Sequence, residues 1–323
     1  MIVMDKQLLK FDRSQLKVES LARRNSDLGL SDILPLEASD SVQKGFRVVA
    51  SKIHTARANN SSIVLMMGAH VLRSGVQRYL IDLMERGYLS CIAINGAGVI
   101  HDFEFALIGA TTENVAHYIR EGYFGLWEET GRINDIVTLA AKNNVGLGEA
   151  VGHVIEEERF PYRDISILAA GYRLCIPVTV HVGVGYDIVH QFPNCDGAAY
   201  GKTSYIDFLK FTKALESLEE GVVMNFGSAV MAPEIYLKAL SMVRNVARQE
   251  GRRICHFTTL VCDLVDLPDN YHNEPSKDNP YYYFRPWKTM LSRTVADGGK
   301  SFYVQGRHAE TIPDLRNAIN ELG

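Results

Sequence analysis

The sequence predicts an α/β fold: a Rossmann-like, doubly wound, mostly parallel sheet flanked by helices. Three observations predict it. Short apolar runs such as 63–67 and 91–94 are continuous rather than alternating, which indicates strands that are buried on both faces. Helical segments separate these runs, as crossovers between parallel strands require. Each run also ends in small residues, which suit tight turns between a strand and a helix.

Strands and helices are expected to alternate along most of the chain. A helical pattern begins after Asp40 and leads into the first strand, and helical segments also fill the region from 95 to 154. The expected strands are 63–67, 91–94, 178–180, 222–225, 254–261 and 301–304. The other expected helices are 76–85, 205–218, 234–249 and 312–322.

The expected domain organisation is an N-terminal arm over residues 1–40 and a single α/β domain over residues 41–323. The segment 267–286 contains four prolines and four tyrosines, which predicts a long loop inside that domain. Loops of this length in compact domains are often functional, so this segment is a candidate part of a site.

Composition limits the kind of protein. Lys and Arg number 34 against 38 Asp and Glu, so no overall basic field attracts nucleic acid or a membrane surface. No uncharged apolar run approaches the ~20 residues that cross a bilayer, and the charged start does not resemble a signal peptide. The five cysteines lack paired ligand spacing, so we expect a cytoplasmic protein with reduced cysteines and no metal site.

The expected ligand site lies at the carboxyl ends of the strands, where open α/β sheets bind ligands. The first, second and fourth strands end in Gly68, in 95–98 and in Gly227-Ser228. Small residues there let backbone N–H groups approach a phosphate, so the sequence favours a nucleotide-binding function. His70, His101 and His181 also fall at strand ends, where ligand contact and a purely structural role are both open.

Residues 281–288, Tyr-Tyr-Tyr-Phe-Arg-Pro-Trp-Lys, form the most unusual cluster in the sequence. An aromatic wall beside Lys288 can hold a cationic amine or make the lysine amine nucleophilic by excluding water. The alternative is a loop that packs its aromatic rings on the protein and leaves Lys288 in water.

Four segments together resemble the deoxyhypusine synthase family. Residues 63–104 contain a strand, a polar exit, a Ser-Gly pair, a second strand and a glycine pair followed by acidic residues. The resemblance continues through 176–187, 225–230 and 287–288, in the same order as in that family.

This resemblance implies a Rossmann-like homotetramer that binds NAD and transfers an aminobutyl group from a polyamine, spermidine, to a protein lysine. The transfer would proceed through a lysine imine. Lys288 matches the family's active lysine and Trp287 its neighbour, while Asp187, with His181 nearby, matches the acid that holds the substrate ammonium. The positions that match cofactor contacts are Ser74, Gly96, Ala97, Gly98, Asp102, Gly227 and Ser228.

The chain departs from the family's pattern in the amine pocket. The family's Trp-Gly-Lys is Trp-Lys here, and Ala232-Pro233-Glu234 replaces a pair of histidines. Two alternatives therefore stay open: a homospermidine-type synthase with a free diamine acceptor, and a nucleotide-binding homologue without transfer chemistry.

Overall fold

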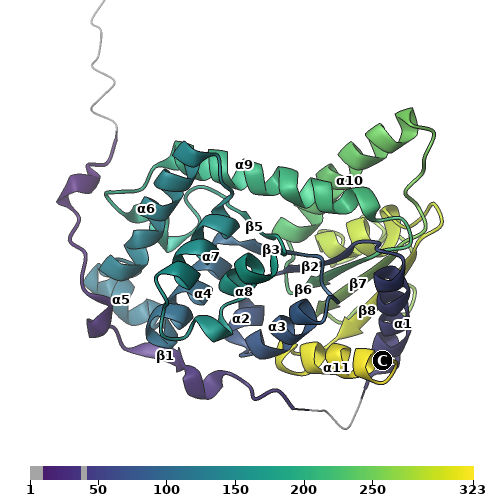
Figure 1. Ribbon diagram of the computed structural model, residues 1–323, viewed down its shortest axis with the longest axis horizontal. Helices are drawn as coiled ribbons and strands as arrows, with labels where there is room; N and C mark the ends of the chain where they lie inside the picture. The colour runs from purple at the N-terminus through teal and green to yellow at the C-terminus, as the bar shows by residue number, and fades with distance from the viewer. Residues whose placement is uncertain (1–9, 38–41) are drawn as a thin grey trace, which may run out of the picture.

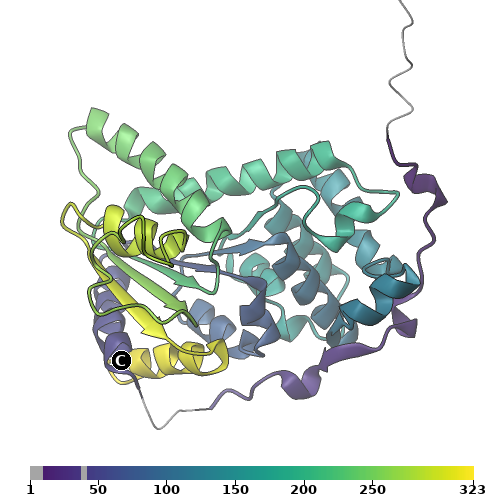
Figure 2. The same ribbon diagram turned by 180° about the vertical axis from the view of Figure 1, so that it is seen from behind.

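The computed structural model describes residues 10–37 and 42–323 and has three layers, with helices on both faces of a central parallel sheet (Figures 1 and 2). Six strands form this sheet in the order β5-β3-β2-β6-β7-β8. Their bounds are β2 Ile63–Met67, β3 Cys91–Asn95, β5 Val178–His181, β6 Val222–Phe226, β7 Thr258–Asp263 and β8 Lys300–Gln305. The predicted fold class is confirmed.

The strand order reverses at the centre of the sheet. The chain starts at β2, adds β3 and β5 on one side, and then returns to add β6, β7 and β8 on the other. Every neighbouring pair is parallel, with Leu65 of β2 opposite Ile92 of β3 and Met224 of β6. Sheets of this order bind ligands where the winding direction changes, which here is between the carboxyl ends of β2 and β6.

Alternate residues of β2 pack against different helical layers. Ile63, Leu65 and Met67 belong to the larger apolar cluster, and Val64 and Met66 belong to the smaller one. Helices α1 (Lys44–Ala58), α3 (Gln77–Glu85) and α11 (His308–Asn320) cover the first face. Helices α9 (Gly197–Ala214) and α10 (Met231–Gln249) cover the second (Figure 1). Burial on both faces explains why the strands read as continuous apolar runs.

The helices lie between the strands as the sequence predicts, although several boundaries differ from the expected ones; the helices expected over 234–249 and 312–322, for example, begin at Met231 and His308. The expected helix 205–218 begins at Gly197, because Asp196 accepts hydrogen bonds from the N–H groups of Ala198 and Ala199 and starts the helix earlier. The expected strand 254–261 begins only at Thr258. The α-helices are α1 Lys44–Ala58, α2 Ala69–Arg73, α3 Gln77–Glu85, α4 Gly96–Ile108, α5 Val115–Glu121, α6 Glu128–Asn143, α7 Leu147–Glu157, α8 Ile167–Leu174, α9 Gly197–Ala214, α10 Met231–Gln249 and α11 His308–Asn320.

The N-terminal arm packs on the body of the protein. Its strand β1, Ser26–Gly29, pairs antiparallel with β4, Ala110–Glu113, and neither strand was expected from the sequence. Arg24 of the arm forms a fully buried ion pair with Glu104 of α4 at 2.8 Å. The predicted boundary at residue 40 lies outside the described residues, so the division into arm and domain stays a prediction.

The expected long loop, residues 267–286, holds none of the named helices or strands, and a π-helical segment, Trp287–Arg293, follows it.

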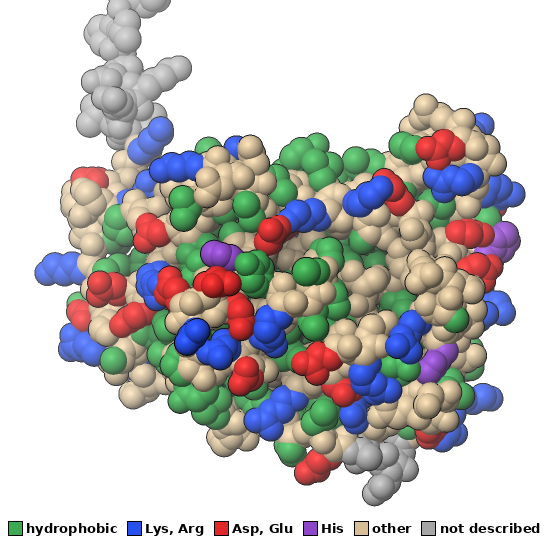
Figure 3. Space-filling view, viewed as in Figure 1, with side chains coloured by type: hydrophobic (Ala, Val, Ile, Leu, Met, Phe, Trp, Pro, Cys, Tyr) green, Lys and Arg blue, Asp and Glu red, His purple; other side chains and the backbone are tan. Residues whose placement is uncertain are grey.

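Among the described residues, no helix has both the length and the apolar character needed to cross a membrane. Acidic and basic side chains are interspersed over the face seen in Figure 3, in keeping with the net charge of −4.

Candidate functional site

The exits of β2 and β6 are in direct backbone contact at the switch point. A Cβ added to Gly68 would lie 2.3 Å from the carbonyl oxygen of Gly227, and the Gly68 N–H donates to Phe226 at 3.0 Å. Gly227 has φ +61°, in the left-handed region that favours glycine. Two glycines are therefore required here, and they leave bare backbone at the position where such sheets bind ligands.

His308 lies beside Gly227, and Arg73 ends α2, the helix that follows Gly68. A Cβ added to Gly227 would lie 2.3 Å from Nε2 of His308, and Arg73 lies 3.2 Å from Nε2 of His70. Nδ1 of His308 and Nε of Arg73 are buried and have no hydrogen-bond partner in the described part of the chain. Burial lowers the pKa of both His70 and His308, so both rings are neutral near pH 7. Buried polar atoms are normally paired, so these nitrogens fit an absent polar ligand such as a phosphate.

The second candidate position is the N-terminus of α4, where Asp187 already supplies a negative charge. The carboxylate accepts a hydrogen bond from the Ala97 N–H, and a Cβ added to Gly96 would lie 2.0 Å from its Oδ2. Burial raises the pKa of Asp187 to about 6. An external phosphate at this helix end would meet a carboxylate, so this position suits a cationic group better than an anion.

His190 stands next to Asp187 with a fixed tautomer. Its Nδ1 accepts hydrogen bonds from the backbone N–H groups of Gly185 at 3.2 Å and Asp187 at 3.1 Å. The neutral ring therefore carries its hydrogen on Nε2, which is buried and lacks a partner among the described residues. The sequence places His190 near this strand end but gives no sign of this orphaned donor.

His101 is oriented by a chain of buried hydrogen bonds. The hydroxyl of Thr111 donates to Glu104 at 2.6 Å and lies 2.8 Å from Nδ1 of His101. A hydroxyl has one hydrogen, so Nδ1 of His101 must be the donor in the second bond and Nε2 must be free to accept. Burial lowers the pKa of His101 to about 4, while the nearby Glu104 carboxylate and Arg73 guanidinium act on it in opposite directions. His101 is thus a neutral, oriented base at the same edge as Arg73.

The predicted catalytic lysine is buried against an aromatic ring. Lys288 is 5% exposed, and its Nζ lies 3.6 Å from the centroid of the Tyr282 ring. Trp287 donates from Nε1 to the carbonyl of Asn273 at 2.9 Å. Lys288 does not project into water, but only part of the predicted aromatic wall lies against it: Tyr282 supplies the ring, whereas Tyr281 is 41% and Tyr283 83% exposed.

Lys288 and Asp187 do not come together within one chain. Asp187 lies at the end of β3, and Lys288 lies between β7 and β8 on the other wing of the sheet. The three strand spacings from β3 to β7 amount to about 14 Å. His181 ends β5, is buried, and lies 3.0 Å from the Thr179 hydroxyl; burial lowers its pKa to about 3. A joint role of Lys288 with Asp187 and His181 stays a prediction.

The residues predicted to contact the cofactor divide into two groups. Ser74, Gly227 and Ser228 lie at the carboxyl edge, where Ser228 also accepts a hydrogen bond from the Ala232 N–H at the start of α10. Asp102 instead lies in the interior, where its oxygens accept from the N–H groups of Ile167 and Leu168 and from the Ser166 hydroxyl. The structure therefore explains Asp102 as a cap of α8, a different role from the one expected.

The glycine turn after β3, residues 96–98, already makes contacts with neighbouring residues of the same segment. Gly98 donates its N–H to Oδ1 of Asn95 at 3.0 Å, and a Cβ added to Gly98 would lie 3.3 Å from Ile94. Gly98 thus serves the packing of α4 against β3. Because Asp187 lies over Gly96 and Gly98 packs against β3, residues 96–98 suit a phosphate less well than Gly68 and Gly227 do.

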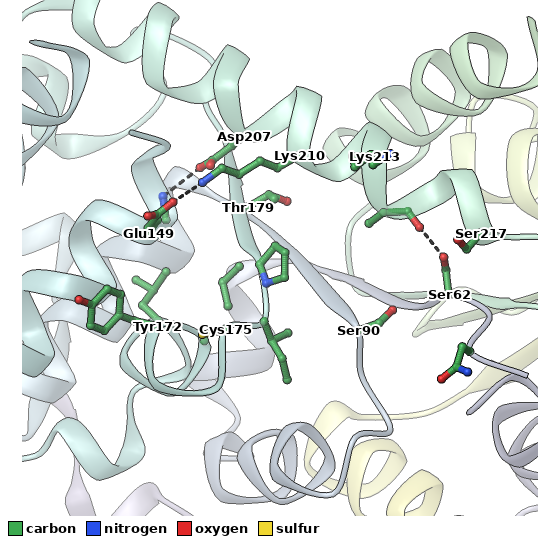
Figure 4. Close-up of a pocket in the computed structure, with 18 of the residues that line it drawn as sticks. Ser62, Ser90, Glu149, Tyr172, Cys175, Thr179, Asp207, Lys210, Lys213 and Ser217 are labelled. Atoms are coloured by element: carbon green, nitrogen blue, oxygen red, sulfur yellow. Dashed lines mark hydrogen bonds and ion pairs between the residues drawn. The ribbon is translucent and has the colours of Figure 1, made fainter. Parts of the chain in front are cut away.

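A cavity of about 680 Å³ at the opposite, amino edge of the sheet was not expected from the sequence (Figure 4). Its charged groups are paired internally. Asp207 accepts from the N–H groups of Gly148 and Val180, both at 2.9 Å, and Lys210 pairs with Glu149. Burial raises the pKa of Asp207 to about 7. Since its charged side chains already have partners within the protein, this cavity is a weaker candidate than the carboxyl edge.

Comparisons with known proteins support a Rossmann-type fold. A family model described as the C-terminal Rossmann fold of arginine dihydrolase ArgZ-like proteins matches residues 47–146. No curated protein matches the chain.

Solved structures with a similar fold share little sequence with the chain. The apo structure of ArgZ, an arginine dihydrolase from the ornithine-ammonia cycle in cyanobacteria, has a TM-score of 0.51 at 13% identity, with 88% of this chain and 34% of that chain covered. AgrE in a ternary complex with ornithine and NAD+ has a TM-score of 0.50 at 13% identity, covering 87% and 34%. A LOR/SDH protein from Methanococcus maripaludis S2 has a TM-score of 0.50 at 15% identity, covering 90% and 74%. The chain thus spans about a third of the length of ArgZ and AgrE.

The expected relation to deoxyhypusine synthases is not supported specifically. A structure described as a deoxyhypusine synthase from Entamoeba histolytica covers 86% of this chain and 87% of that chain. Its TM-score of 0.41 at 8% identity is too low to support a relation to that family. At these identities the comparisons define a class of fold, the Rossmann type, and not a particular activity.

Proposed function

We propose that this protein is an NAD-dependent enzyme that acts on a small amine substrate at the carboxyl edge of its sheet. The observation that carries the proposal is the contact of Gly68 with Gly227 at the switch point, flanked by the unpaired nitrogens of Arg73 and His308. Bare backbone and unpaired nitrogens at this position suit the phosphates of a dinucleotide.

The neighbouring residues suit a substrate with an ammonium group. NAD, when bound, accepts or returns a hydride. Asp187 offers a carboxylate that no described side chain neutralises by an ion pair, and His101 offers a free Nε2 lone pair on a ring held by Thr111. A carboxylate for the ammonium and a neutral base for a proton are what oxidation at a carbon beside an amine requires. AgrE, which has a similar fold, binds ornithine and NAD+, and this likeness supports an amine or amino-acid substrate here.

The proposal is tested by following NAD+ reduction in the presence of single amines, including ornithine, putrescine and spermidine. We expect NADH to form with at least one of them, and His101→Gln to lower kcat by about 100-fold or more while NAD+ affinity is retained. NAD+ binding without turnover of any amine would favour the non-catalytic, nucleotide-binding alternative. An absence of NAD+ binding in the parent would overturn the proposal.

A narrower candidate is aminobutyl transfer from spermidine through an imine on Lys288, in a homotetramer. It is supported by the burial of Lys288 against the Tyr282 ring, an environment that excludes water from the amine. Because Lys288 and Asp187 lie on different wings of one chain, this candidate requires a site that is completed by a second chain.

The transfer candidate is tested with NAD+, spermidine and borohydride. An adduct should form on Lys288 and should be absent in Lys288→Arg, while Lys300→Arg, a change at an exposed lysine, should leave it intact. Transfer to free putrescine would identify the homospermidine-type alternative. Light scattering that gives the monomer mass of 36.1 kDa, or an unmodified Lys288 with spermidine consumed, would contradict the transfer candidate.

A further inference from the structure

Three metal-ligating side chains meet at the amino edge of the sheet, far from the candidate nucleotide site. Glu219 lies in the loop before β6, and Cys255 and His256 lie in the segment before β7. Nδ1 of His256 lies 2.7 Å from Oε1 of Glu219 and 3.4 Å from Sγ of Cys255. All three donor atoms lie within 4.8 Å of one another, and this is the one such group in the part of the chain that the structure describes.

The distances between these donor atoms are close to the ligand-to-ligand distances of a tetrahedral metal site. Zinc binds imidazole nitrogen and carboxylate oxygen at about 2.0–2.2 Å and thiolate sulfur at about 2.3 Å. Tetrahedral angles then give ligand-to-ligand distances of about 3.3–3.6 Å. The Cys255–His256 distance already falls in this range, and the Glu219–His256 distance needs to open by about half an ångström.

The backbone holds the carboxylate and the imidazole in place. Oε2 of Glu219 accepts from the N–H of Cys255 at 2.7 Å and from the N–H of His256 at 3.1 Å, which leaves Oε1 directed at the ring. On the other side of the ring, a Cβ added to Gly298 would lie 3.0 Å from Cδ2 of His256. Outer contacts that orient the ligands are a regular feature of protein metal sites.

We propose that Glu219, Cys255 and His256 bind one zinc-type divalent cation, with a water molecule as the fourth ligand. The thiolate and imidazole are ligands of a borderline-soft metal rather than of Mg²⁺ or Ca²⁺. Cys255 is buried and His256 is exposed, so the metal sits at the surface with its fourth position open to solvent. The sequence concealed this site, because two ligands are adjacent and the third lies 36 residues earlier.

Binding has a defined proton balance and a defined structural consequence. The S–H bond of Cys255 breaks, its proton passes to solvent and a metal–sulfur bond forms, while the neutral His256 ring moves its hydrogen from Nδ1 to Nε2. Arg253, a cation whose charge interacts with Cys255 and Glu219, is paired with Asp297 at 2.9 Å and so is partly neutralised. The metal would tie the entrance of β6 to that of β7, a role independent of the proposed catalytic function.

The test uses the full chain after dialysis against a chelator, with Zn²⁺ and Co²⁺ as probes. Calorimetry should give one Zn²⁺ per chain, and Co²⁺ should produce a thiolate charge-transfer band. Cys255→Ser and His256→Ala should each weaken Zn²⁺ binding by about 10-fold or more, and Cys255→Ser should remove the band. Cys175→Ser is the matched control, because Cys175 is an exposed cysteine outside the cluster.

Thermal unfolding of each metal-free variant separates loss of a ligand from loss of the fold. A variant that unfolds before metal is added is replaced by Glu219→Gln, which keeps the backbone contacts and should also weaken binding. The proposal is overturned if the parent lacks stoichiometric Zn²⁺ binding, if the Co²⁺ form lacks the thiolate band, or if the folded Cys255→Ser variant binds as the parent does.

Discussion

The carboxylate of Asp187 lies over the backbone of Gly96, where any side chain on residue 96 would collide with it. The carboxylate therefore puts a negative charge at the N-terminus of α4, a position where a phosphate could otherwise bind. It also buries the carboxylate enough to raise its pKa to about 6, so its charge changes close to physiological pH.

Binding of an amine substrate should therefore depend on pH through Asp187. Affinity should rise as pH increases through about 6, because the carboxylate forms and the amine stays protonated. Asp187→Asn should remove this dependence and weaken binding about 10-fold at pH 8, since a charge-assisted contact is lost. The measurement is KM for the amine between pH 5 and 8, with Asp278→Asn at an exposed position as the control. An unchanged pH profile in Asp187→Asn would assign the substrate to another group.

Much of the fold could be predicted from the sequence because burial on both faces leaves a local signal. All six strands of the main sheet were expected, since five of them carry apolar residues buried along nearly their whole length; β8, at the edge of the sheet, is only partly buried. Strands β1 and β4 were missed because their sequences, SDLG and ATTE, carry no such run and pair across about 80 residues.

The candidate site was harder to predict, because its roles depend on which atoms the fold brings together. The family resemblance placed Asp102 among the cofactor contacts, but in the structure it lies inward and accepts hydrogen bonds from the first residues of α8. The unpaired nitrogens of Arg73 and His308 and the Glu219–Cys255–His256 cluster come from distant segments with no common motif.

The contact between Gly68 and Gly227 should be intolerant of a side chain. Gly68→Ala places a methyl group 2.3 Å from a backbone oxygen, so the exits of β2 and β6 must separate. We expect the free energy of unfolding in urea to fall by about 1–3 kcal/mol. Gly201→Ala, on an open face of α9, should instead raise it by about 0.5–1 kcal/mol. Equal stability of Gly68→Ala and the parent would contradict the contact.

Buried Asp207 should make the parent less stable as pH rises. Its pKa is about 7 in the folded protein against 3.8 ordinarily, so between these values the folded state holds a proton that the unfolded state has lost. Its contribution to stability therefore falls from pH 4 to about 7 and then levels off. Asp207→Asn keeps an oxygen for Gly148 and Val180, and its stability relative to the parent should increase by roughly 1–3 kcal/mol over this range. Urea unfolding of both proteins at several pH values tests this, and a constant difference would refute it.

The ion pair between Arg24 and Glu104 should hold the arm on α4. Both side chains are 1% exposed, so Arg24→Met leaves a buried carboxylate without its counter-charge. We expect a loss of about 3–5 kcal/mol in the free energy of unfolding. The control is Arg47→Met, which breaks an exposed pair with Glu321 and should cost less than about 1 kcal/mol. Similar losses in the two variants would show that burial of the Arg24 pair has no special effect.

Hydrogen–deuterium exchange with and without saturating NAD+ shows whether the cofactor binds at the carboxyl edge of the sheet, because a bound cofactor slows exchange of the backbone that it covers. We predict slower exchange in residues 68–75 and 227–232, at the carboxyl ends of β2 and β6. Segments that line the amino-edge cavity, 175–179 and 210–217, should exchange at the same rate in both states. Protection confined to the amino-edge segments, or no protection in either region, would contradict NAD+ binding at the carboxyl ends of β2 and β6.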